Sequence, residues 1–286
     1  MENHVDFVNS LIKKYQVIKI PYSNVKVISE IGAGQEGKVY QGFYNNEKIA
    51  IKIINEFDKK CLESEVAILQ NISHKCIPKL YGIIVEVNMI ALVLQLIEGK
   101  TLADIPIKLL KQEKKIEIMK QLCSIIEFIH SKNLIHRDVK PENILISFNT
   151  NSLELYLIDY GISRVISKGS DYATRTRGTT YYLAPENLEA CGFTDSDDII
   201  STINNKVDVW SFGCVVSYLF SGILPWTNIC NDEESAIIEQ LVFKNEFPIP
   251  ENIKDDTIID IISKATIVDP ADRRTMSELK LLVESI

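Results

Sequence analysis

The stretch that decides the fold reads His136-Arg137-Asp138-Val139-Lys140-Pro141-Glu142-Asn143-Ile144-Leu145-Ile146. It begins with charged and polar side chains and ends in a short aliphatic run, which predicts a loop that leads into a strand. Three of its side chains suit phosphoryl transfer. Asp138 can accept the proton of a substrate hydroxyl, Lys140 can neutralise charge on the transferred group, and Asn143 can offer its carbonyl oxygen to a metal ion. The alternative is a polar turn with an accidental match.

A glycine-rich segment upstream, Ile31-Gly32-Ala33-Gly34-Gln35-Glu36-Gly37-Lys38-Val39-Tyr40, lies between two alternating segments at 25–31 and 38–44. A glycine turn between two strands lets backbone N–H groups approach phosphates without interference from a Cβ. A dinucleotide-binding fingerprint would have to open a helix, whereas the residues after this turn read as a strand. A Walker A loop would need Ser or Thr where Val39 stands. The pattern therefore favours a phosphate-covering hairpin.

The apolar run Ile49-Ala50-Ile51-Lys52 ends in a lysine, and a helix is predicted next, from about Lys59 to Asn71. Leu62, Val66 and Leu69 share one face of that helix. A lysine that binds phosphate needs a carboxylate partner, and the helix offers two candidates, Glu63 and Glu65.

Four further segments follow in the second half of the chain: Leu155-Tyr156-Leu157-Ile158-Asp159-Tyr160-Gly161, Gly178-Thr179-Thr180-Tyr181-Tyr182-Leu183-Ala184-Pro185-Glu186, Asp208-Val209-Trp210-Ser211-Phe212-Gly213 and Asp269-Pro270-Ala271-Asp272-Arg273. Together with the segments above, in this order, they resemble the eukaryotic protein kinase family over about residues 27–286. Lys140 is typical of the serine/threonine type, and residues 20–25 are similar to the entry segment of the tyrosine-kinase-like subgroup.

The resemblance implies an α+β, two-lobed protein kinase fold with the nucleotide in the cleft. Residues 1–26 form an N-terminal extension with a helix from Val5 to Tyr15 that could pack on the small lobe. The small lobe, residues 27–94, is a mainly antiparallel sheet plus one helix. Residues 95–97 form the hinge, and residues 98–286 form a mainly α-helical lobe.

The resemblance also assigns site residues. Lys52 grips the phosphates, and Glu65 is preferred over Glu63 as its partner because Leu69 and Leu80 then take the family's spine positions. Asp159 and Asn143 are the expected metal ligands, and Arg273 is expected to form a salt bridge with Glu186. Tyr160 replaces the usual phenylalanine, so its hydroxyl needs a hydrogen-bond partner if it is buried. The residues expected to line the ATP site are Ile31, Gly32, Ala33, Gly34, Gly37, Val39, Ala50, Lys52, Gln95, Ile97, Thr101 and Leu145.

A regulatory role is expected for the segment before Gly178. Thr174 and Thr176 lie where the family carries its activating phosphate, with Thr176 favoured, and Arg137 would bind that phosphate. The competing account pairs Arg137 with an acidic residue near Asp195. Glu36 departs from the family, which usually has an aromatic residue at this loop tip, and residues 193–205 are a surplus that reads as a surface insertion or a docking loop.

Composition agrees with a globular protein: 46% of the 286 residues are hydrophobic, 24% are charged, and the net charge is −8. That charge disfavours nucleic acid and anionic membranes as partners. The six cysteines occur singly, and no signal peptide is visible, which favours a reducing, cytoplasmic setting with nuclear access left open. Residues 209–226 carry no formal charge but contain Ser, Gly and Pro, so they read as the buried central helix rather than a membrane span.

The expected activity is transfer of the γ-phosphoryl group of ATP to Ser or Thr hydroxyls of protein substrates. Mg²⁺ is the expected metal, with Mn²⁺ as an alternative, and an upstream kinase is an expected partner. A pseudokinase scaffold is the alternative from another class, although Lys52, Glu65, Asp138, Asn143 and Asp159 are all present. A lipid or small-molecule kinase is disfavoured by residues 178–186, which resemble a peptide-docking segment.

Overall fold

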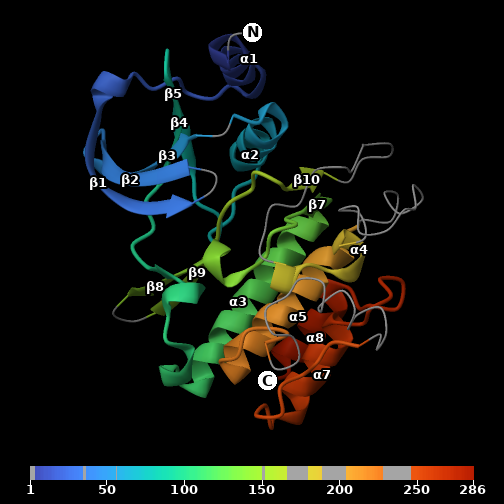
Figure 1. Ribbon diagram of the computed structural model, residues 1–286. Helices are drawn as coiled ribbons and strands as arrows, with labels where there is room; N and C mark the ends of the chain where they lie inside the picture. Colours follow the sequence, from blue (N-terminus) through green and yellow to red (C-terminus); the bar gives the residue numbers. More distant parts are fainter. Residues whose placement is uncertain are drawn as a thin grey trace. The chain divides into compact units, whose positions relative to one another are not determined.

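The computed structural model describes residues 4–34, 37–55, 57–149, 152–165, 180–188, 204–227 and 246–286. The chain divides into two compact units (Figure 1). The first contains residues 1–99 together with 156–161, and the second contains residues 100–155 and 162–286. The short segment 156–161 therefore packs with the first unit although it follows residues 100–155 in sequence. The expected mixed α+β architecture is confirmed, with an antiparallel sheet at the N-terminal end and a mainly helical C-terminal part.

The first unit is built on a five-stranded antiparallel sheet with the order β1-β2-β3-β5-β4. Its strands are β1 (Val25–Gly34), β2 (Gly37–Tyr44), β3 (Glu47–Ile54), β4 (Leu80–Glu86) and β5 (Met89–Gln95). Aliphatic residues dominate β3 and β5, and both of these strands have neighbours on each side, so they form the buried middle of the sheet. A single turn of 3₁₀-helix, Tyr22–Asn24, precedes β1.

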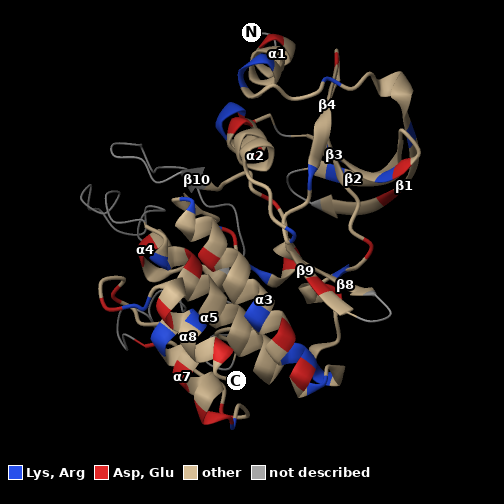
Figure 2. Ribbon diagram, turned by 180° about the vertical axis from the view of Figure 1, so that it is seen from behind, with Lys and Arg blue, Asp and Glu red and all other residues tan. Residues whose placement is uncertain are grey.

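Two helices accompany this sheet, α1 (His4–Tyr15) and α2 (Lys59–Asn71), and they lie side by side in Figures 1 and 2. The expected helices at 5–15 and 59–71 are thus confirmed. The side chain of Asp58 caps α2 by accepting hydrogen bonds from the N–H groups of Lys60 and Cys61, which satisfies two donors that a helix start leaves open. Apolar residues of α1, α2, β4 and β5 form one continuous core.

The second unit is mainly helical. Its helices are α3 (Gln112–Ser131), α4 (Pro185–Leu188), α5 (Lys206–Ser221), α7 (Asp256–Ala265) and α8 (Met276–Glu284), with 3₁₀ turns at Leu102–Asp104, Ile107–Leu109, Pro141–Asn143 and Thr180–Tyr182. Short strands form two small sheets, β10-β7 and β6-β8-β9. Their bounds are β6 (Lys100–Thr101), β7 (Leu134–Ile135), β8 (Ile144–Asn149), β9 (Ser152–Leu157) and β10 (Arg164–Val165), and the last two residues of β9 belong to the first unit.

Helix α5 forms the centre of the second unit, and almost all of its side chains are buried. It begins at Lys206 and ends at Ser221. The helix therefore starts three residues before the expected range 209–226 and ends five residues before the end of that range. Gly222 terminates it with a φ of 68°, in the left-handed region, and its N–H bonds to the carbonyl of Tyr218. Within the described ranges, no helix is long and apolar enough to span a membrane.

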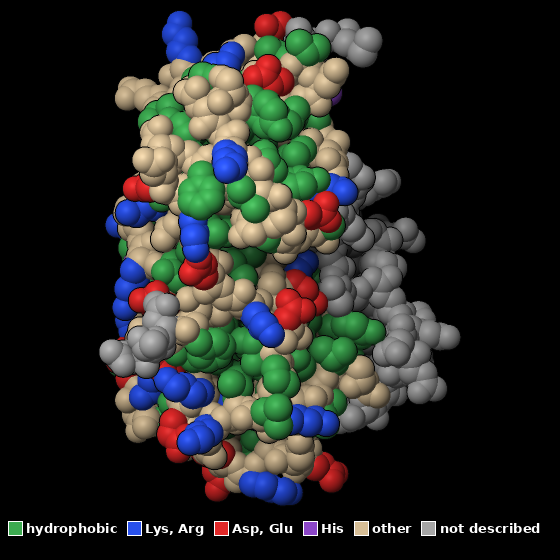
Figure 3. Space-filling view, turned by 90° about the vertical axis from the view of Figure 1, so that its left-hand side faces the viewer, with side chains coloured by type: hydrophobic (Ala, Val, Ile, Leu, Met, Phe, Trp, Pro, Cys, Tyr) green, Lys and Arg blue, Asp and Glu red, His purple; other side chains and the backbone are tan. Residues whose placement is uncertain are grey.

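Charged side chains of both signs are scattered among hydrophobic and other residues on the face of the molecule shown in Figure 3. They do not gather into a patch of one sign over the described part of that face.

Candidate active site

The first unit brings one lysine together with two carboxylates. Lys52 lies on β3 between β2 and β5, opposite Val39 and Leu92. Its Nζ atom is 3.0 Å from Oε1 and 3.2 Å from Oε2 of Glu65, and 3.1 Å from Oδ1 of Asp159. The Lys52 and Glu65 side chains are only 11% and 5% exposed. Because charge pairs shielded from water are weakly screened by salt, this contact holds the ammonium group in place.

The geometry of α2 explains which glutamate meets Lys52. Residues two positions apart on an α-helix are separated by about 200° around its axis, so Glu63 and Glu65 face nearly opposite sides of α2. Glu65 faces Lys52, whereas Glu63 accepts hydrogen bonds from Nζ of Lys14 at 2.7 Å and from the hydroxyl of Tyr15 at 3.2 Å. The structure therefore places the glutamate preferred from the sequence against Lys52, and it gives the other one a contact with α1.

Asp159 has an unusual backbone. Its φ is 67°, a left-handed conformation that costs a residue other than glycine about 1–3 kcal/mol and that clusters at functional sites. The surrounding chain holds it there: the N–H of Leu157 donates to the carbonyl of Cys76, and the N–H of Gly161 donates to Oδ1 of Asp159. The buried Tyr160 donates its hydroxyl hydrogen bond to the carbonyl of Leu157 at 3.2 Å, so the partner expected for that hydroxyl is present.

The glycine-rich hairpin ends with Gly34 opposite Gly37. Gly37 has a φ of 153°, and a Cβ added there would lie 1.9 Å from the carbonyl oxygen of Ile53, so no other residue fits this position. Glu36 lies outside the described residues. The three other hairpin residues expected to cover the nucleotide are exposed on β1: Ile31, Gly32 and Ala33.

The remaining nucleotide-site candidates fall on both units. In the first, Val39 is half-buried on β2 and Ala50 is buried on β3. Gln95 ends β5, with its N–H bonded to the carbonyl of Lys79, and Ile97 follows it. In the second unit Thr101 pairs with Leu145 between β6 and β8. The Thr101 hydroxyl donates to the Asp104 carboxylate and accepts from the Asp104 N–H, so it caps a 3₁₀ turn.

The second unit brings together the polar side chains of the loop at residues 138–143. The amide nitrogen of Asn143 donates to the carbonyl oxygen of Asp138 at 2.9 Å and to its carboxylate at 2.7 Å. Nζ of Lys140 lies 2.8 Å from the same carboxylate, at Oδ2. The three residues therefore form one group, in which an ammonium and an amide fix the carboxylate that could act as a base.

Asp208 anchors this loop, a role that its place in the sequence did not reveal. Its Oδ1 accepts the N–H of Arg137 at 2.7 Å, and its Oδ2 accepts the N–H of His136 at 2.8 Å. Nε2 of His130 lies 2.9 Å from Oδ2. Asp208 is completely buried at the start of α5. The signal that could have identified it is a lone carboxylate at the head of a helix that carries no charge after it, where a buried charge must be compensated.

The charge on Asp208 is compensated from three sides. Burial by itself raises the pKa of a carboxyl group, but the hydrogen bond and charge of His130, the charge of His136 and the backbone hydrogen bond from Arg137 together lower the pKa of Asp208 below its ordinary value. Asp208 is thus an anion that holds two consecutive backbone N–H groups immediately before Asp138. This contact fixes the path of the loop from inside the second unit.

Arg137 is itself buried and has a φ of 71°. A left-handed residue directly before the candidate base is a second instance of backbone strain next to a proposed functional group. Its expected partners Thr174 and Thr176 lie outside the described residues, as do most of the surplus residues 193–205. The regulatory assignment therefore stays a prediction.

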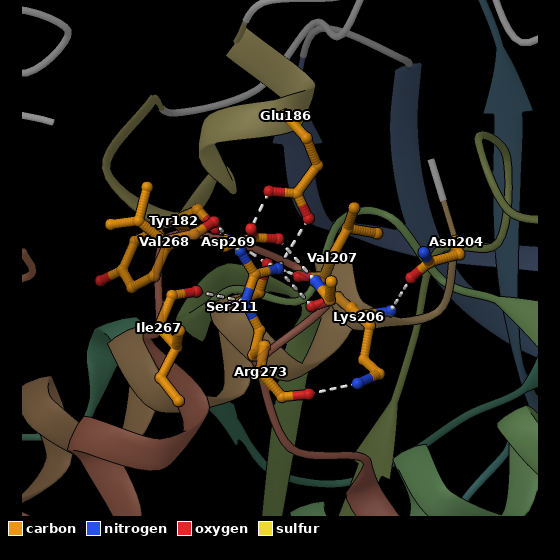
Figure 4. Close-up of polar contacts among 11 residues, drawn as sticks. Tyr182, Glu186, Asn204, Lys206, Val207, Ser211, Ile267, Val268, Asp269 and Arg273 are labelled. Atoms are coloured by element: carbon orange, nitrogen blue, oxygen red, sulfur yellow. Dashed lines mark hydrogen bonds and ion pairs between the residues drawn. The ribbon is translucent and has the colours of Figure 1, made fainter. Parts of the chain in front are cut away.

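The expected bridge between Arg273 and Glu186 is present and lies wholly within the second unit (Figure 4). The guanidinium nitrogens bond to the two Glu186 carboxylate oxygens at 2.6 and 3.0 Å. The same group also donates to carbonyls of Ile267, Val268 and Lys206. This network joins α4 to the segment between α7 and α8, and it also holds the start of α5.

Asp159 in the first unit and Asn143 in the second each offer an oxygen of the kind that a magnesium ion prefers. Asp159 offers a carboxylate that is partly exposed, at 23%. Asn143 uses its amide nitrogen for Asp138, so the amide orientation leaves its carbonyl oxygen as the acceptor. Carboxylate and amide oxygens are what Mg²⁺ prefers. Both residues therefore fit the metal that the sequence assigns to them.

Comparisons with known proteins agree with this geometry. The pattern of the protein kinase domain matches residues 25–281. A probable serine/threonine-protein kinase, MARK-A of Dictyostelium discoideum, is 32% identical over 90% of this chain and 23% of its own length. CBL-interacting protein kinase 10 of Oryza sativa subsp. japonica is 30% identical over 95% of this chain and 56% of its own. A probable casein kinase II subunit alpha homolog of Encephalitozoon cuniculi is 29% identical over 93% and 86%.

The chain spans about a quarter of the length of the first of these relatives and just over half of the length of the second. Its match to the family pattern nevertheless covers nearly all of its own residues, and the site residues described above lie inside the match. The chain therefore belongs to the protein kinase domain family.

Proposed function

We propose that this chain transfers the γ-phosphoryl group of ATP to serine or threonine hydroxyls of protein substrates. The observation that carries the proposal is the Asp138–Lys140–Asn143 group, held by the buried Asp208. A carboxylate that is bonded by an amide on one side and an ammonium on the other is fixed in orientation. Such a group can align a substrate hydroxyl and take its proton.

Each half of the machinery has a defined task in this proposal. Lys140 would offset the charge that develops on the transferred group, and Lys52, steadied by Glu65, would bind the phosphates of the nucleotide. Asp159 and Asn143 would hold Mg²⁺, which supplies charge neutralisation on the phosphate oxygens when bound. The reaction requires both groups of residues to act on one nucleotide. The glycine-rich hairpin is proposed to surround the ATP together with the other nucleotide-site candidates: Val39, Ala50, Gln95, Ile97, Thr101 and Leu145.

The test is purified protein with magnesium-ATP and a degenerate peptide array, with Asp138→Asn as the paired variant. Asn keeps the shape but cannot take a proton, so turnover should fall by roughly 10²–10⁴-fold while nucleotide binding persists. Asp159→Asn should instead weaken magnesium-dependent nucleotide binding, because it removes a ligand. Equal turnover in Asp138→Asn and the parent protein would refute the assignment of the base.

The same experiment separates the alternative function. A protein that binds nucleotide but shows no phosphorylation above the Asp138→Asn level would be a nucleotide-binding scaffold rather than an enzyme. The array also reports whether Ser and Thr, rather than Tyr, accept the phosphate. A Tyr preference would contradict the substrate class proposed from Lys140.

We also propose that phosphorylation at Thr176, or secondarily Thr174, regulates this activity through Arg137. Arg137 adjoins Asp138, and Asp208 holds its backbone, so an anion bound by its guanidinium would order chain next to the base. Mass spectrometry of active protein, with Thr174→Ala and Thr176→Ala assayed singly and together, tests this. Full activity of an unmodified double variant would overturn it and favour the acidic residues near Asp195.

A cytoplasmic site of action, with access to the nucleus, is proposed from the isolated spacing of the cysteines, which is typical of a reducing compartment. An upstream kinase is the partner that the threonine switch would require. Cell fractionation with a tagged chain tests the location, and recovery of the chain only in an oxidising compartment would contradict it.

A further inference from the structure

The family pattern begins at residue 25, but α1 lies before it and is packed into the first unit. Val8 and Leu11 of α1 are fully buried, and they join a core that includes Leu62 and Val66 of α2. These two α2 residues are four apart, so they form one stripe along the helix. The apolar stripe of α2 is thus covered by an element that the family pattern does not contain.

The two ends of α1 add polar and aromatic contacts to α2 and the residues before it. At the N-terminal end, the His4 ring stacks on Phe57 with centroids 4.0 Å apart, and Nζ of Lys59 lies 5.2 Å from the centroid of the Phe7 ring. At the C-terminal end, Lys14 and Tyr15 both bond to Glu63. The contact therefore runs from the start of α2 into its second turn.

The segment after α1 is tied to the sheet by its main chain. The N–H of Ile83 donates to the carbonyl of Ile18 at 2.8 Å, and the N–H of Ile20 donates to the carbonyl of Ile83 at 2.9 Å. These bonds dock residues 18–20 on β4. Because α1 is anchored to the sheet and packs on α2, it links the position of α2 to the sheet that carries Lys52.

The contact of Glu65 with Lys52 depends on this link. Glu63 and Glu65 point to nearly opposite sides of α2, as described above, so α1 holds one side of the helix while Lys52 meets the other. A rotation or shift of α2 that breaks the α1 contact also moves Glu65 away from Nζ of Lys52. A displacement of about 1 Å in a group that positions substrate can be enough to lower activity heavily.

We propose that α1 is a positioning element for catalysis: it fixes α2 so that Glu65 stays on Lys52, with Leu11 as the main contact. This inference rests on the proposed kinase function for its effect on turnover, but not for its effect on α2. The apolar contact dominates, because the Lys14–Glu63 pair is largely exposed, and exposed pairs contribute little.

The principal test compares two cavity variants in the full chain, Leu11→Ala and Ile84→Ala. Ile84 is also fully buried in the first unit, but it belongs to the second core cluster, which contains no residue of α1 or α2. Both variants should lower the melting temperature. Only Leu11→Ala should speed amide hydrogen exchange across residues 62–69, by about tenfold or more, because only that variant loosens α2 locally.

Turnover gives the second readout. Leu11→Ala should lower kcat about tenfold, which corresponds to about 1.4 kcal/mol of barrier, and leave the KM for peptide unchanged. In a Glu65→Gln background Leu11→Ala should cause no further loss, because the group through which it acts is already gone. Ile84→Ala should keep the parent kcat at a temperature where it is folded.

Three results would overturn the proposal: unchanged exchange in α2, equal loss of kcat in both cavity variants, or losses that multiply with Glu65→Gln. If Leu11→Ala does not fold, the surface double variant Lys14→Ala/Tyr15→Phe replaces it, with Lys13→Ala as the matched control. Lys13 is exposed in the same turn of α1. The double variant should speed exchange in α2 by a smaller factor, and Lys13→Ala should not.

Failure of the proposed function is distinguishable from failure of this inference. A chain without phosphotransfer activity would still show whether Leu11→Ala selectively loosens residues 62–69. If the chain is active but Leu11→Ala leaves amide hydrogen exchange in α2 unchanged, the kinase assignment is retained and the role of α1 is refuted.

Discussion

Arg273 with Glu186 in the second unit and Lys52 with Glu65 in the first are both ion pairs shielded from water, but they are built differently. Arg273 makes five hydrogen bonds, two to the Glu186 carboxylate and three to backbone carbonyls. A guanidinium has five N–H donors, so every donor is engaged inside the unit. Lys52 is instead shared between side chains of Glu65 and Asp159.

The difference separates a structural pair from a pair suited to function. The Arg273 network ties its arginine to backbone carbonyls of three residues, and the guanidinium also lies 5.1 Å from the Trp210 ring. Such a group can be removed only by breaking the local fold. The contacts of Lys52 described above are to side chains on α2 and on the strained segment at Asp159, and these can move with their elements. The Arg273–Glu186 pair stabilises one local arrangement of the fold, whereas the Lys52–Glu65 contact depends on the position of α2.

The largest effect is expected for Arg273→Ala. Its loss leaves the buried Glu186 carboxylate without its cation, which should lower the free energy of unfolding by about 3–5 kcal/mol. Urea unfolding measures this. Arg274→Ala is the matched control, because its pair with Glu278 is about half exposed and should contribute below about 1 kcal/mol. Similar losses in the two variants would erase the distinction between the pairs.

Glu65→Gln should act mainly on catalysis. Without the carboxylate charge Lys52 loses its ionic partner on α2, and kcat/KM should fall by about 10²-fold. Steady-state kinetics measure the loss, and circular dichroism should show a folded protein. Glu63→Gln is the neighbouring control and should stay within a few-fold of the parent, since about 1 kcal/mol or less is expected from its exposed pair. A larger effect from Glu63 than from Glu65 would reverse the assignment.

Gly213→Ala tests how closely α5 must approach α7 to build the Arg273 network. An added Cβ would lie 2.6 Å from Cγ2 of Thr266 and 2.8 Å from Cβ of Ala265, just before the carbonyls that accept from Arg273. Overpacking of this kind should cost about 1–3 kcal/mol in unfolding free energy. Ser217→Ala, one turn further along α5, is the comparison variant, because it removes an atom from a buried position instead of adding one. If Gly213→Ala left the free energy of unfolding unchanged, α5 and α7 could separate without loss of stability.

The smallest effect is expected at the start of α8. Hydrogen bonds from the backbone and then the side chain of Thr275, followed by Arg274, lower the pKa of Glu278 from 4.5 to about 2. A pKa that is lower in the folded state stabilises the fold above the unfolded value. The advantage of the parent over Glu278→Gln should therefore be complete above pH 4.5 and vanish as the pH falls through about 2.

Unfolding of the parent and Glu278→Gln at a series of pH values measures this difference, with Glu284→Gln at the other end of the helix as control. A gap between parent and Glu278→Gln that stays constant from neutral to acidic pH would contradict the capping role. It would also indicate that the charge of this carboxylate has no part in holding the start of α8.

Much of the fold could be predicted because its signals are local. The helix predicted from about Lys59 to Asn71 is found at those bounds, since its apolar spacing marks it. The central helix was less well placed: Gly222 could be read as part of an uncharged run, and only its left-handed φ shows that the helix ends at Ser221. The group around Asp138 was predictable because all its members lie within six residues.

By itself, the sequence determined the order of the segments, the residue types available for chemistry and the helix and strand periods. These are properties of near neighbours along the chain, and spacing alone reveals them. Family resemblance already favoured Glu65 over Glu63 as the partner of Lys52. Only the tertiary structure decided that Glu63 instead contacts α1, that Asp208 anchors the backbone before Asp138, and that α1 covers α2. Each of these depends on contacts between residues far apart in sequence, whose geometry follows from packing and from the need to compensate buried charge.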